Sequence, residues 1–212
     1  MSREAVLQRV RTALGRVPGQ APPAPPPPLF ANHTLNAESR VASFIHRFEL
    51  LAGKAVRVPD AKAAGDWVAS FLIGRTAVAS NAPYLAECGI TALLGVRTGF
   101  TGRAELKAAC AEANVGISSA DFALAETGTM VMLASPLNPR LISLLPPVHI
   151  AVFPESILLT GLDELYTRVP KPADGSSSMV FITGPSRTAD IEQILVRGVH
   201  GPGEVYAILV AA

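Results

Sequence analysis

The sequence predicts an α/β protein with a mostly parallel sheet flanked by helices. Short apolar runs alternate with stretches of helical periodicity from residue 36 onward. Such alternation is typical of parallel sheets, because the connection between two parallel strands usually contains a helix. Hydrophobic residues make up 49% of the 212 residues and charged residues 17%, which is enough apolar material for a buried core.

The N-terminal region is predicted to be separate from this core. Residues 1–16 are expected to form a short helix with Val6 and Val10 on one face and the arginines largely elsewhere. Residues 17–35 are rich in proline, which favours a semi-rigid spacer over a ligand for a partner domain. The remaining domain spans residues 36–212. The first helix can pack on its own domain or on another subunit, and both alternatives stay open.

The core elements follow from the periodicity of apolar residues in chain order. Residues 36–51 carry apolar side chains at helical spacing, with Val41, Phe44 and Phe48 on one side. Further helices are predicted at residues 61–73, 104–113, 138–145, 162–168 and 189–196. Strands are predicted at residues 55–58, 76–80, 90–96, 130–134, 149–153, 179–183 and 205–210.

Two of the predicted helices have a marked start. Asn138 and Pro139 offer an N-cap followed by proline at the first helical position. At the other start, Gly184 and Pro185 end a strand, and a helix is expected to open at residues 186–188.

The second of these starts is a candidate ligand site, because free N–H groups at the start of a helix favour anions. Arg187 would bind a phosphate or a carboxylate through two parallel hydrogen bonds. In the simpler interpretation, Ser186 or Thr188 caps the helix and Arg187 pairs with a neighbouring acid. From this turn alone, the simpler interpretation is favoured.

The stretch from Ala120 to Met130 is another candidate. Asp121 and Glu126 are its only acids, and both lie among small and apolar neighbours just before an apolar run that predicts a buried strand. Gly128 allows the chain to bend there. A carboxylate beside a bend at the end of a buried strand is a common place for chemistry in α/β proteins, although both acids can equally cap a turn.

The loop at residues 196–204 places three glycines and a proline around His200. Glycine allows the backbone to approach a ligand closely, so His200 is better placed for function than the other histidines. It can equally bond a loop carbonyl and be structural.

Several classes of function are disfavoured. The net charge of +1 argues against a nucleic-acid binder, and no apolar run is long enough to span a bilayer. The charged N-terminus does not resemble an export signal, so a cytoplasmic protein is expected. Cys88 and Cys110 lie too far apart to form a metal-binding pair, and an iron–sulfur cluster needs more thiolates than two. No dinucleotide or Walker A fingerprint is present, so neither a cofactor nor a metal is expected.

Three segments together resemble the lactate utilization protein C family, whose members are built on a single LUD domain. They are residues 120–129, residues 143–150, and residues 184–192 with 198–202. The resemblance covers residues 36–212. It implies a fold similar to sugar-phosphate isomerases and CoA transferases. It also implies a role in oxidising L-lactate to pyruvate, together with the iron–sulfur lactate utilization proteins A and B as partners.

Two hypotheses follow from the resemblance. In the first, the protein is a non-redox subunit whose site binds a small carboxylate or phosphate, or docks a partner. In the second, it is an enzyme that acts on a phosphorylated or CoA-linked acid. The Glu126-Thr127-Gly128 sequence loosely resembles the Glu-x-Gly of CoA transferases, but their glycine-rich CoA-binding loop is not recognisable, so the subunit hypothesis ranks first.

Both hypotheses use the same predicted site at the carboxyl ends of the strands. In it Glu126 is base or nucleophile, Arg187 binds the anion and His200 carries a proton. The full set of predicted site residues is Glu126, Thr127, Gly128, Thr129, Gly184, Ser186, Arg187, Thr188 and His200.

Overall fold

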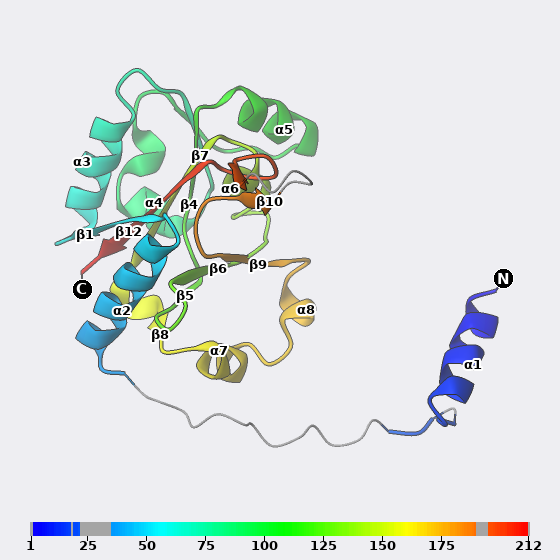
Figure 1. Cartoon of the computed structure of the whole chain (residues 1–212). Coiled ribbons are helices and arrows are strands. Elements are labelled where there is room, and N and C mark those ends of the chain that lie inside the picture. Colours follow the sequence, from blue (N-terminus) through cyan, green and yellow to red (C-terminus); the bar gives the residue numbers. More distant parts are fainter. Residues whose placement is uncertain (1, 18, 22–34, 190–194, 212) are drawn as a thin grey trace. The chain divides into compact units, whose positions relative to one another are not determined.

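A computed structural model describes residues 2–17, 19–21, 35–189 and 195–211 (Figure 1). The described residues fall into two compact units, taken from residues 1–32 and 33–212. The first unit holds helix α1 (Arg3–Ala13), which begins after Ser2, whose Oγ accepts a hydrogen bond from Ala5 N. Most of the predicted proline-rich linker, residues 22–34, lies outside the described residues, and the predicted division of the chain at residues 16 and 35 stays a prediction.

The core of the second unit is a parallel sheet, which confirms the predicted fold class. Among the described residues it has six strands in the order β1-β12-β7-β4-β2-β3, and every neighbouring pair is parallel. The strands are β1 (Lys54–Val58), β12 (Glu204–Val210), β7 (Val148–Pro154), β4 (Val115–Ser118), β2 (Ala77–Ala79) and β3 (Val96–Arg97).

A smaller sheet lies beside the large one. Its order within the described chain is β8-β5-β6-β9, and the β5–β6 and β6–β9 pairs are antiparallel. The strands are β8 (Leu158–Leu159), β5 (Phe122–Leu124), β6 (Thr129–Leu133) and β9 (Met179–Ile182). The predicted strands at residues 130–134 and 179–183 are therefore present but belong to this second sheet. The sequence did not separate them from the parallel strands, because β6 is buried on both faces and so has the same continuous apolar run.

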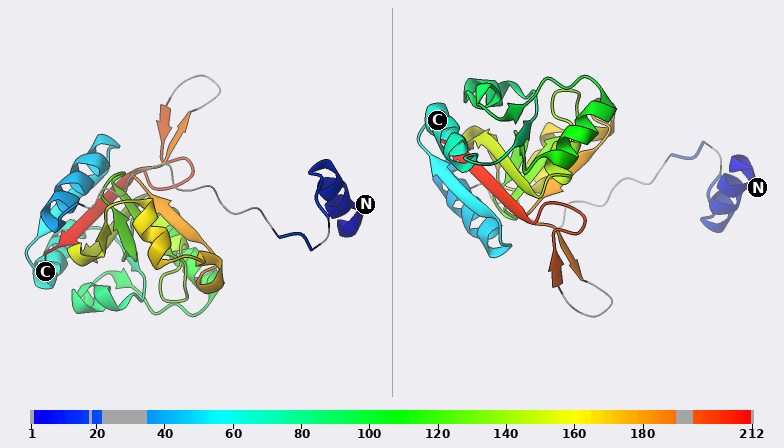
Figure 2. Two further views of the ribbon diagram at one scale, coloured as in Figure 1. Left: turned by 90° about the horizontal axis from the view of Figure 1, so that it is seen from below. Right: turned by 90° about the horizontal axis from the view of Figure 1, so that it is seen from above.

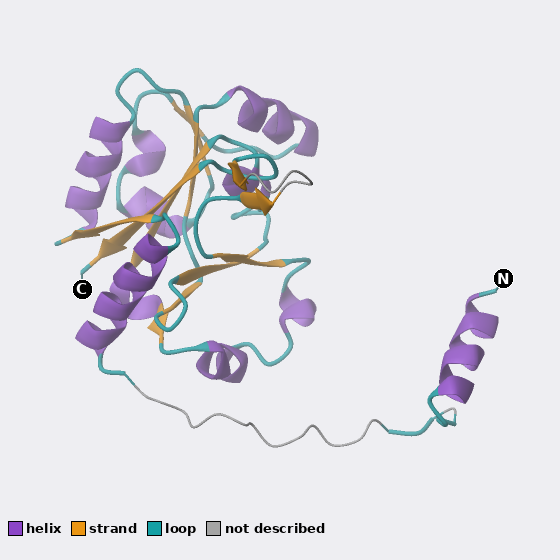
Figure 3. Cartoon of the chain, viewed as in Figure 1, coloured by secondary structure: helices purple, strands orange, loops and turns teal. Residues whose placement is uncertain are grey.

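Helices cover both faces of the large sheet (Figures 2 and 3). On one face pack α3 (Ala61–Phe71) and α4 (Pro83–Glu87), in a cluster that includes Val68, Leu85 and Ile117. On the other face, α5 (Arg103–Glu112) and α6 (Leu141–Leu144) cover Val78. The rest of that face packs against α2 (Ala37–Leu50) and the smaller sheet, with aromatic and methionine side chains between them, namely Phe44, Phe48, Phe153, Met130 and Met132.

Side-chain caps explain where two of the longer helices begin. Asn36 Oδ1 accepts a hydrogen bond from Ser39 N at 2.9 Å, and Asp60 Oδ1 accepts one from Ala63 N at 2.7 Å. Two short helices, α7 (Leu162–Arg168) and α8 (Pro172–Gly175), lie between β8 and β9 in the chain. No helix in the described part of the chain is long and apolar enough to cross a membrane.

Three predicted elements are wrong. Instead of a helix opening at residues 186–188, the strands β10 (Arg187–Ala189) and β11 (Leu195–Arg197) pair with each other in antiparallel register. The predicted strand at residues 90–96 is instead a 3₁₀ turn, η1 (Ile90–Ala92), followed by a turn at residues 93–95, and only Val96 belongs to β3. Asn138 does not cap a helix, because its side chain bonds elsewhere and α6 begins only at Leu141.

Candidate functional site

The order of the strands points to one place on the large sheet where a ligand is expected. From β2 the chain moves to β3 at one edge, whereas from β4 it moves toward β7 and β12 on the other side. Neighbouring parallel strands whose connections leave in opposite directions open a crevice at their carboxyl ends. Ser80 follows β2 at this position, and Ser118 and Ser119 lie at the end of β4.

The loop at residues 134–140 lies over these strand ends and is fixed to them by hydrogen bonds. Asn81 N donates to Leu137 O at 2.8 Å, and Asn138 Nδ2 donates to Ser119 O at 3.0 Å. Asn138 N in turn donates to Ser135 Oγ at 3.0 Å. The loop that leads into α6 is therefore positioned by the carboxyl ends of β2 and β4.

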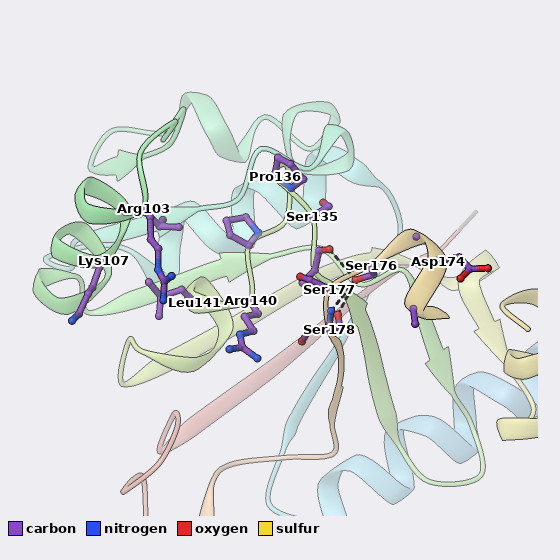
Figure 4. A pocket seen from close by; sticks show the side chains of 15 residues that line it. Arg103, Lys107, Ser135, Pro136, Arg140, Leu141, Asp174, Ser176, Ser177 and Ser178 are labelled. Carbon is purple, nitrogen blue, oxygen red and sulfur yellow. Dashed lines mark hydrogen bonds between the residues drawn. The ribbon is translucent and has the colours of Figure 1, made fainter. Parts of the chain in front are cut away.

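A cleft of about 1010 Å³ opens beside this loop. It lies between the first turns of α5, residues 134–141, and residues 173–178 (Figure 4). We call Arg103, Lys107 and Arg140 the cationic wall, and Ser176, Ser177 and Ser178 the serine wall. Apolar side chains complete the lining, among them Leu106, Pro136, Pro139 and Leu141.

The charge of the cleft is unbalanced. None of the three side chains of the cationic wall makes an ion pair with another described residue, although eight such pairs occur elsewhere in the described chain. Asp174 is the single carboxylate in the described lining. Three cations against one acid leave the lining positive, so the cleft can bind an anion.

The serine wall is fixed to the end of the smaller sheet. Ser176 Oγ lies 2.9 Å from the carbonyl oxygens of both Ala134 and Ser178, and Ala134 N donates to Ser178 O at 2.9 Å. These bonds join the residues before β9 to the residue after β6, as the dashed lines in Figure 4 show in part. The serine wall and the loop that leads to Arg140 are therefore both attached to strand ends.

The site residues predicted from the sequence lie elsewhere. Glu126 and Thr127 are exposed in the turn between β5 and β6. The Glu126 carboxylate lies against Gly161, where an added Cβ would come within 2.3 Å of Glu126 Oε2. Gly161 is the N-cap of α7, so the carboxylate lies at a helix start, where negative charge is favourable.

A short chain of hydroxyl groups joins the same turn to β9. Thr127 Oγ1 lies 2.7 Å from Thr129 Oγ1, which lies 3.1 Å from Thr183 Oγ1. The structure thus brings Thr127 and Thr129 close to the residue that precedes Gly184. Gly184 itself, at φ 144°, packs so closely on the residue that ends α2 that an added Cβ would lie 2.8 Å from Leu51 O.

The other predicted residues form a second group. Ser186 N donates to Pro202 O at 2.9 Å, and Gly198 N donates to Ser186 O at 3.1 Å. These bonds bring the loop that carries His200 to Ser186, and both His200 and Arg187 are exposed. Thr188 lies in β10, and its side chain is outside the described part.

Among the described residues, no hydrogen bond or ion pair joins Glu126 to Arg187 or His200, and the combined site stays a prediction. The cleft lies at the opposite end of β6 and β9, where Leu133 pairs with Met179. Thr129 and Leu133 are four residues apart, or about 13 Å along a strand.

Sequence reasoning missed the walls of the cleft. The sequence motifs place Arg140 only beside the Asn138-Pro139 helix start, and they single out neither Arg103 nor Lys107. One signal in the sequence was available. A cation on a helix often pairs with an acid four residues earlier, but the residues four positions before Arg103 and Arg140 are Gly99 and Pro136, so neither arginine has such an acid to pair with. Their convergence depends on strand order, which no local pattern carries.

One buried histidine bonds to the end of β4. His149 in β7 is fully buried, and its Nε2 lies 2.8 Å from Ser118 Oγ. Its Nδ1 has no hydrogen-bond partner among the described residues. Burial lowers the pKa of His149 from 6.5 to about 3, so the ring is neutral near pH 7.

Comparison with known proteins places this fold in a family. The pattern of the LUD domain matches residues 41–210. Lactate utilization protein C of Geobacillus thermodenitrificans is 32% identical over 234 residues, covering 99% of this chain and 96% of that one. A protein of the same name from Halalkalibacterium halodurans is 35% identical over 157 residues, covering 70% and 68%.

A solved structure has the same fold. A DUF162 family protein from Deinococcus radiodurans superposes with a TM-score of 0.64 at 20% identity, covering 83% of this chain and 99% of that chain. At this identity the likeness concerns the fold alone. The match to the LUD domain covers most of the chain, as the resemblance of the sequence motifs predicted. The chain therefore belongs to the LUD domain family.

Proposed function

We propose that this protein is a component of an L-lactate utilization system, which oxidises L-lactate to pyruvate, and that it acts there as a non-redox, anion-binding subunit. The role in lactate utilization is supported by similarity to a protein named lactate utilization protein C along almost the whole of both chains. The observation that carries the anion-binding role is the cationic wall, whose three charges have no acidic partner among the described residues.

The chemistry of the two cysteines supports a non-redox role. Burial raises the pKa of the Cys88 and Cys110 thiols to about 11. The thiolate, rather than the thiol, binds iron, and a cluster needs several thiolates. In this proposal, the electrons from lactate are carried by the iron–sulfur lactate utilization proteins A and B.

The same burial predicts that both thiols are unreactive. Native protein treated with iodoacetamide at pH 8 is expected to stay unlabelled at Cys88 and Cys110, because each thiol is buried and almost wholly protonated at that pH. Protein unfolded in urea is expected to be labelled at both. Peptide mass spectrometry measures the two fractions, and rapid labelling of either thiol in the native protein would contradict the prediction.

Helix α1 is the element proposed to dock on the partner proteins. Within its own unit, the helix leaves Val6 46% exposed and Val10 49% exposed, and Leu14, the residue after the helix, 61% exposed, so it offers apolar side chains that a partner can bury. An isolated helix of this length is marginal in water, and burying one apolar face on another protein would stabilise it.

Affinity purification from lactate-grown cells tests the proposed role. Tagged full-length protein is expected to bring down the iron–sulfur proteins A and B, and the double variant Val6→Ser, Val10→Ser is expected to lose most of them, because it removes two apolar contacts from α1. Gln8→Ser, an exposed polar position of the same helix, is the matched control. If the wild-type protein is purified without either iron–sulfur protein, and deletion of its gene does not slow growth on L-lactate, the proposed function is wrong.

The enzyme hypothesis is less well supported. It needs the Glu126 carboxylate beside a bound substrate, whereas this carboxylate lies against Gly161 at the start of α7 and outside the cleft.

A further inference from the structure

We propose that the cleft binds an organic anion of about nucleotide size that carries a phosphoryl group, rather than lactate or pyruvate. This inference takes one point from the proposed function, namely that the cleft is the site where the protein binds an anion. It assigns the class of ligand from the charge, the size and the rigidity of the lining.

The charge of the lining exceeds what a monocarboxylate needs. Arg103 and Lys107 are four residues apart on α5 and so lie on one side of that helix. Arg140 reaches the cleft from a different element, the residue before α6. A ligand with two or more negative charges can contact both elements at once and balances more of the charge of the lining than a single carboxylate does.

The volume of the cleft and the apolar part of its lining also favour a ligand larger than lactate. The cleft, at about 1010 Å³, has the volume of sites that hold drug-sized or cofactor-sized molecules. Leu106, Leu141 and Pro136 line it together with the cations (Figure 4). An apolar surface of this kind binds the flat body of a larger ligand, while lactate offers one methyl group to it.

The backbone that presents Arg140 is fixed before any ligand arrives. Ser143 is buried, and its Oγ donates to Arg140 O at 2.9 Å. The loop that precedes Arg140 is bonded to the ends of β2 and β4 through Leu137 and Asn138. Across the cleft, Ser176 is bonded to the end of β6. The backbone of both loops is therefore in place before a ligand binds, so binding has to order only the exposed side chains of the cationic wall.

The serine wall adds hydrogen-bonding groups opposite the cations. Ser177 is exposed, and its hydroxyl makes no hydrogen bond to another described residue. It can donate to a ligand oxygen or accept from a sugar hydroxyl. An anionic head on the cationic wall and a polar group on the serine wall together describe a molecule with two ends, such as a sugar phosphate or a nucleotide.

Isothermal titration calorimetry of the purified full-length protein tests this inference, with ADP as the probe. ADP is expected to bind with a Kd below about 1 mM, at least tenfold more tightly than L-lactate or inorganic phosphate, and adenosine is expected not to bind measurably. Arg140→Gln and Lys107→Gln are each expected to weaken ADP binding about tenfold, because each removes one charge-assisted hydrogen bond.

Lys62→Gln is the matched control, because it removes one exposed positive charge from α3, which packs on the other face of the large sheet. It is expected to leave ADP binding unchanged. Thermal unfolding of each variant without ligand shows whether it is folded.

Three results would overturn the inference. These are ADP binding no more tightly than inorganic phosphate, unchanged ADP binding in both cleft variants, and binding of a hexaglutamate peptide where ADP does not bind, which would make the cleft a docking surface for an acidic protein. Growth on L-lactate and co-purification are measured separately. Normal ADP binding without any lactate phenotype would reject the proposed function and leave this inference standing.

Discussion

Replacing Gly128 by alanine is expected to lower the free energy of unfolding by about 2–5 kcal/mol, the sum of backbone strain and overpacking. Gly128 has φ 62°, and an added Cβ would lie 2.4 Å from Phe48 N and 2.8 Å from the Arg47 carbonyl carbon. These are backbone atoms of α2 and cannot rotate away. The measurement is urea unfolding, and the matching fall in the melting temperature is about 10 °C for a chain of this size.

Two other glycines separate the causes of this loss. Gly74 also has a positive φ, at 74°, but an added Cβ would meet nothing within 4 Å, so Gly74→Ala reports the strain alone, about 1 kcal/mol. Gly175 has neither constraint, and Gly175→Ala is expected to be close to neutral. A Gly128→Ala protein as stable as Gly74→Ala would show that the turn does not pack on α2 as described.

The result also bears on the predicted role of Gly128 as a ligand-binding residue. The Glu126-Thr127-Gly128 sequence is a candidate because it places a carboxylate beside a bend at a buried strand, and glycine allows that bend. In the structure, the backbone that Gly128 approaches is the end of α2. The glycine is therefore accounted for by the packing of the turn on this helix.

Acidification is expected to destabilise the protein through His149. Its pKa is 6.5 when exposed and about 3 in the folded protein, so the unfolded chain binds the proton more readily. The contribution of the neutral ring is fully present above about pH 6.5 and is lost as the pH falls toward 3, by about 2 kcal/mol at pH 5 and about 4 kcal/mol at pH 3. Urea unfolding between pH 7 and pH 4 measures the slope.

The slope has a direct control. His149→Gln keeps a side chain that can bond Ser118 Oγ but does not titrate, so its stability is expected to change much less between pH 7 and pH 5. His46→Gln, at an exposed position of α2, is expected to keep the wild-type slope. Equal slopes for wild type and His149→Gln would assign the acid sensitivity to carboxylates instead.

The longer helices could be predicted because local signals agree in them. At residues 36–51 the apolar period, the Asn36 cap and the length all indicate one helix, and α2 spans Ala37–Leu50. At residues 189–196 the period is that of a helix, but both described ends of this range belong to the antiparallel strands β10 and β11, in which each strand satisfies backbone groups of the other. Residues 190–194 lie outside the described part. In such short segments tertiary pairing overrides periodicity.

The site was harder to predict than the fold for a similar reason. The Asn138-Pro139-Arg140 sequence was interpreted as a helix start, yet the side-chain amide of Asn138 donates to Ser119 O at the end of β4. That bond joins residues 19 positions apart and positions Arg140 beside α5. A motif can show that a residue is unusual, but which residues it meets depends on how the strands are ordered.

The position of β12 has a consequence for the order in which the protein can fold during synthesis. β12 lies between β1 and β7, and its pairing with β1 joins Lys54 to Tyr206. Until β12 has left the ribosome, β1 has no neighbour in the sheet and the edge of β7 stays open. Exposed edges of this kind attract other chains, and pairing over so long a separation is slow. The nascent protein is therefore most prone to aggregate just before β12 emerges from the ribosome. A chaperone that covers the open strand edges would help folding most at this stage.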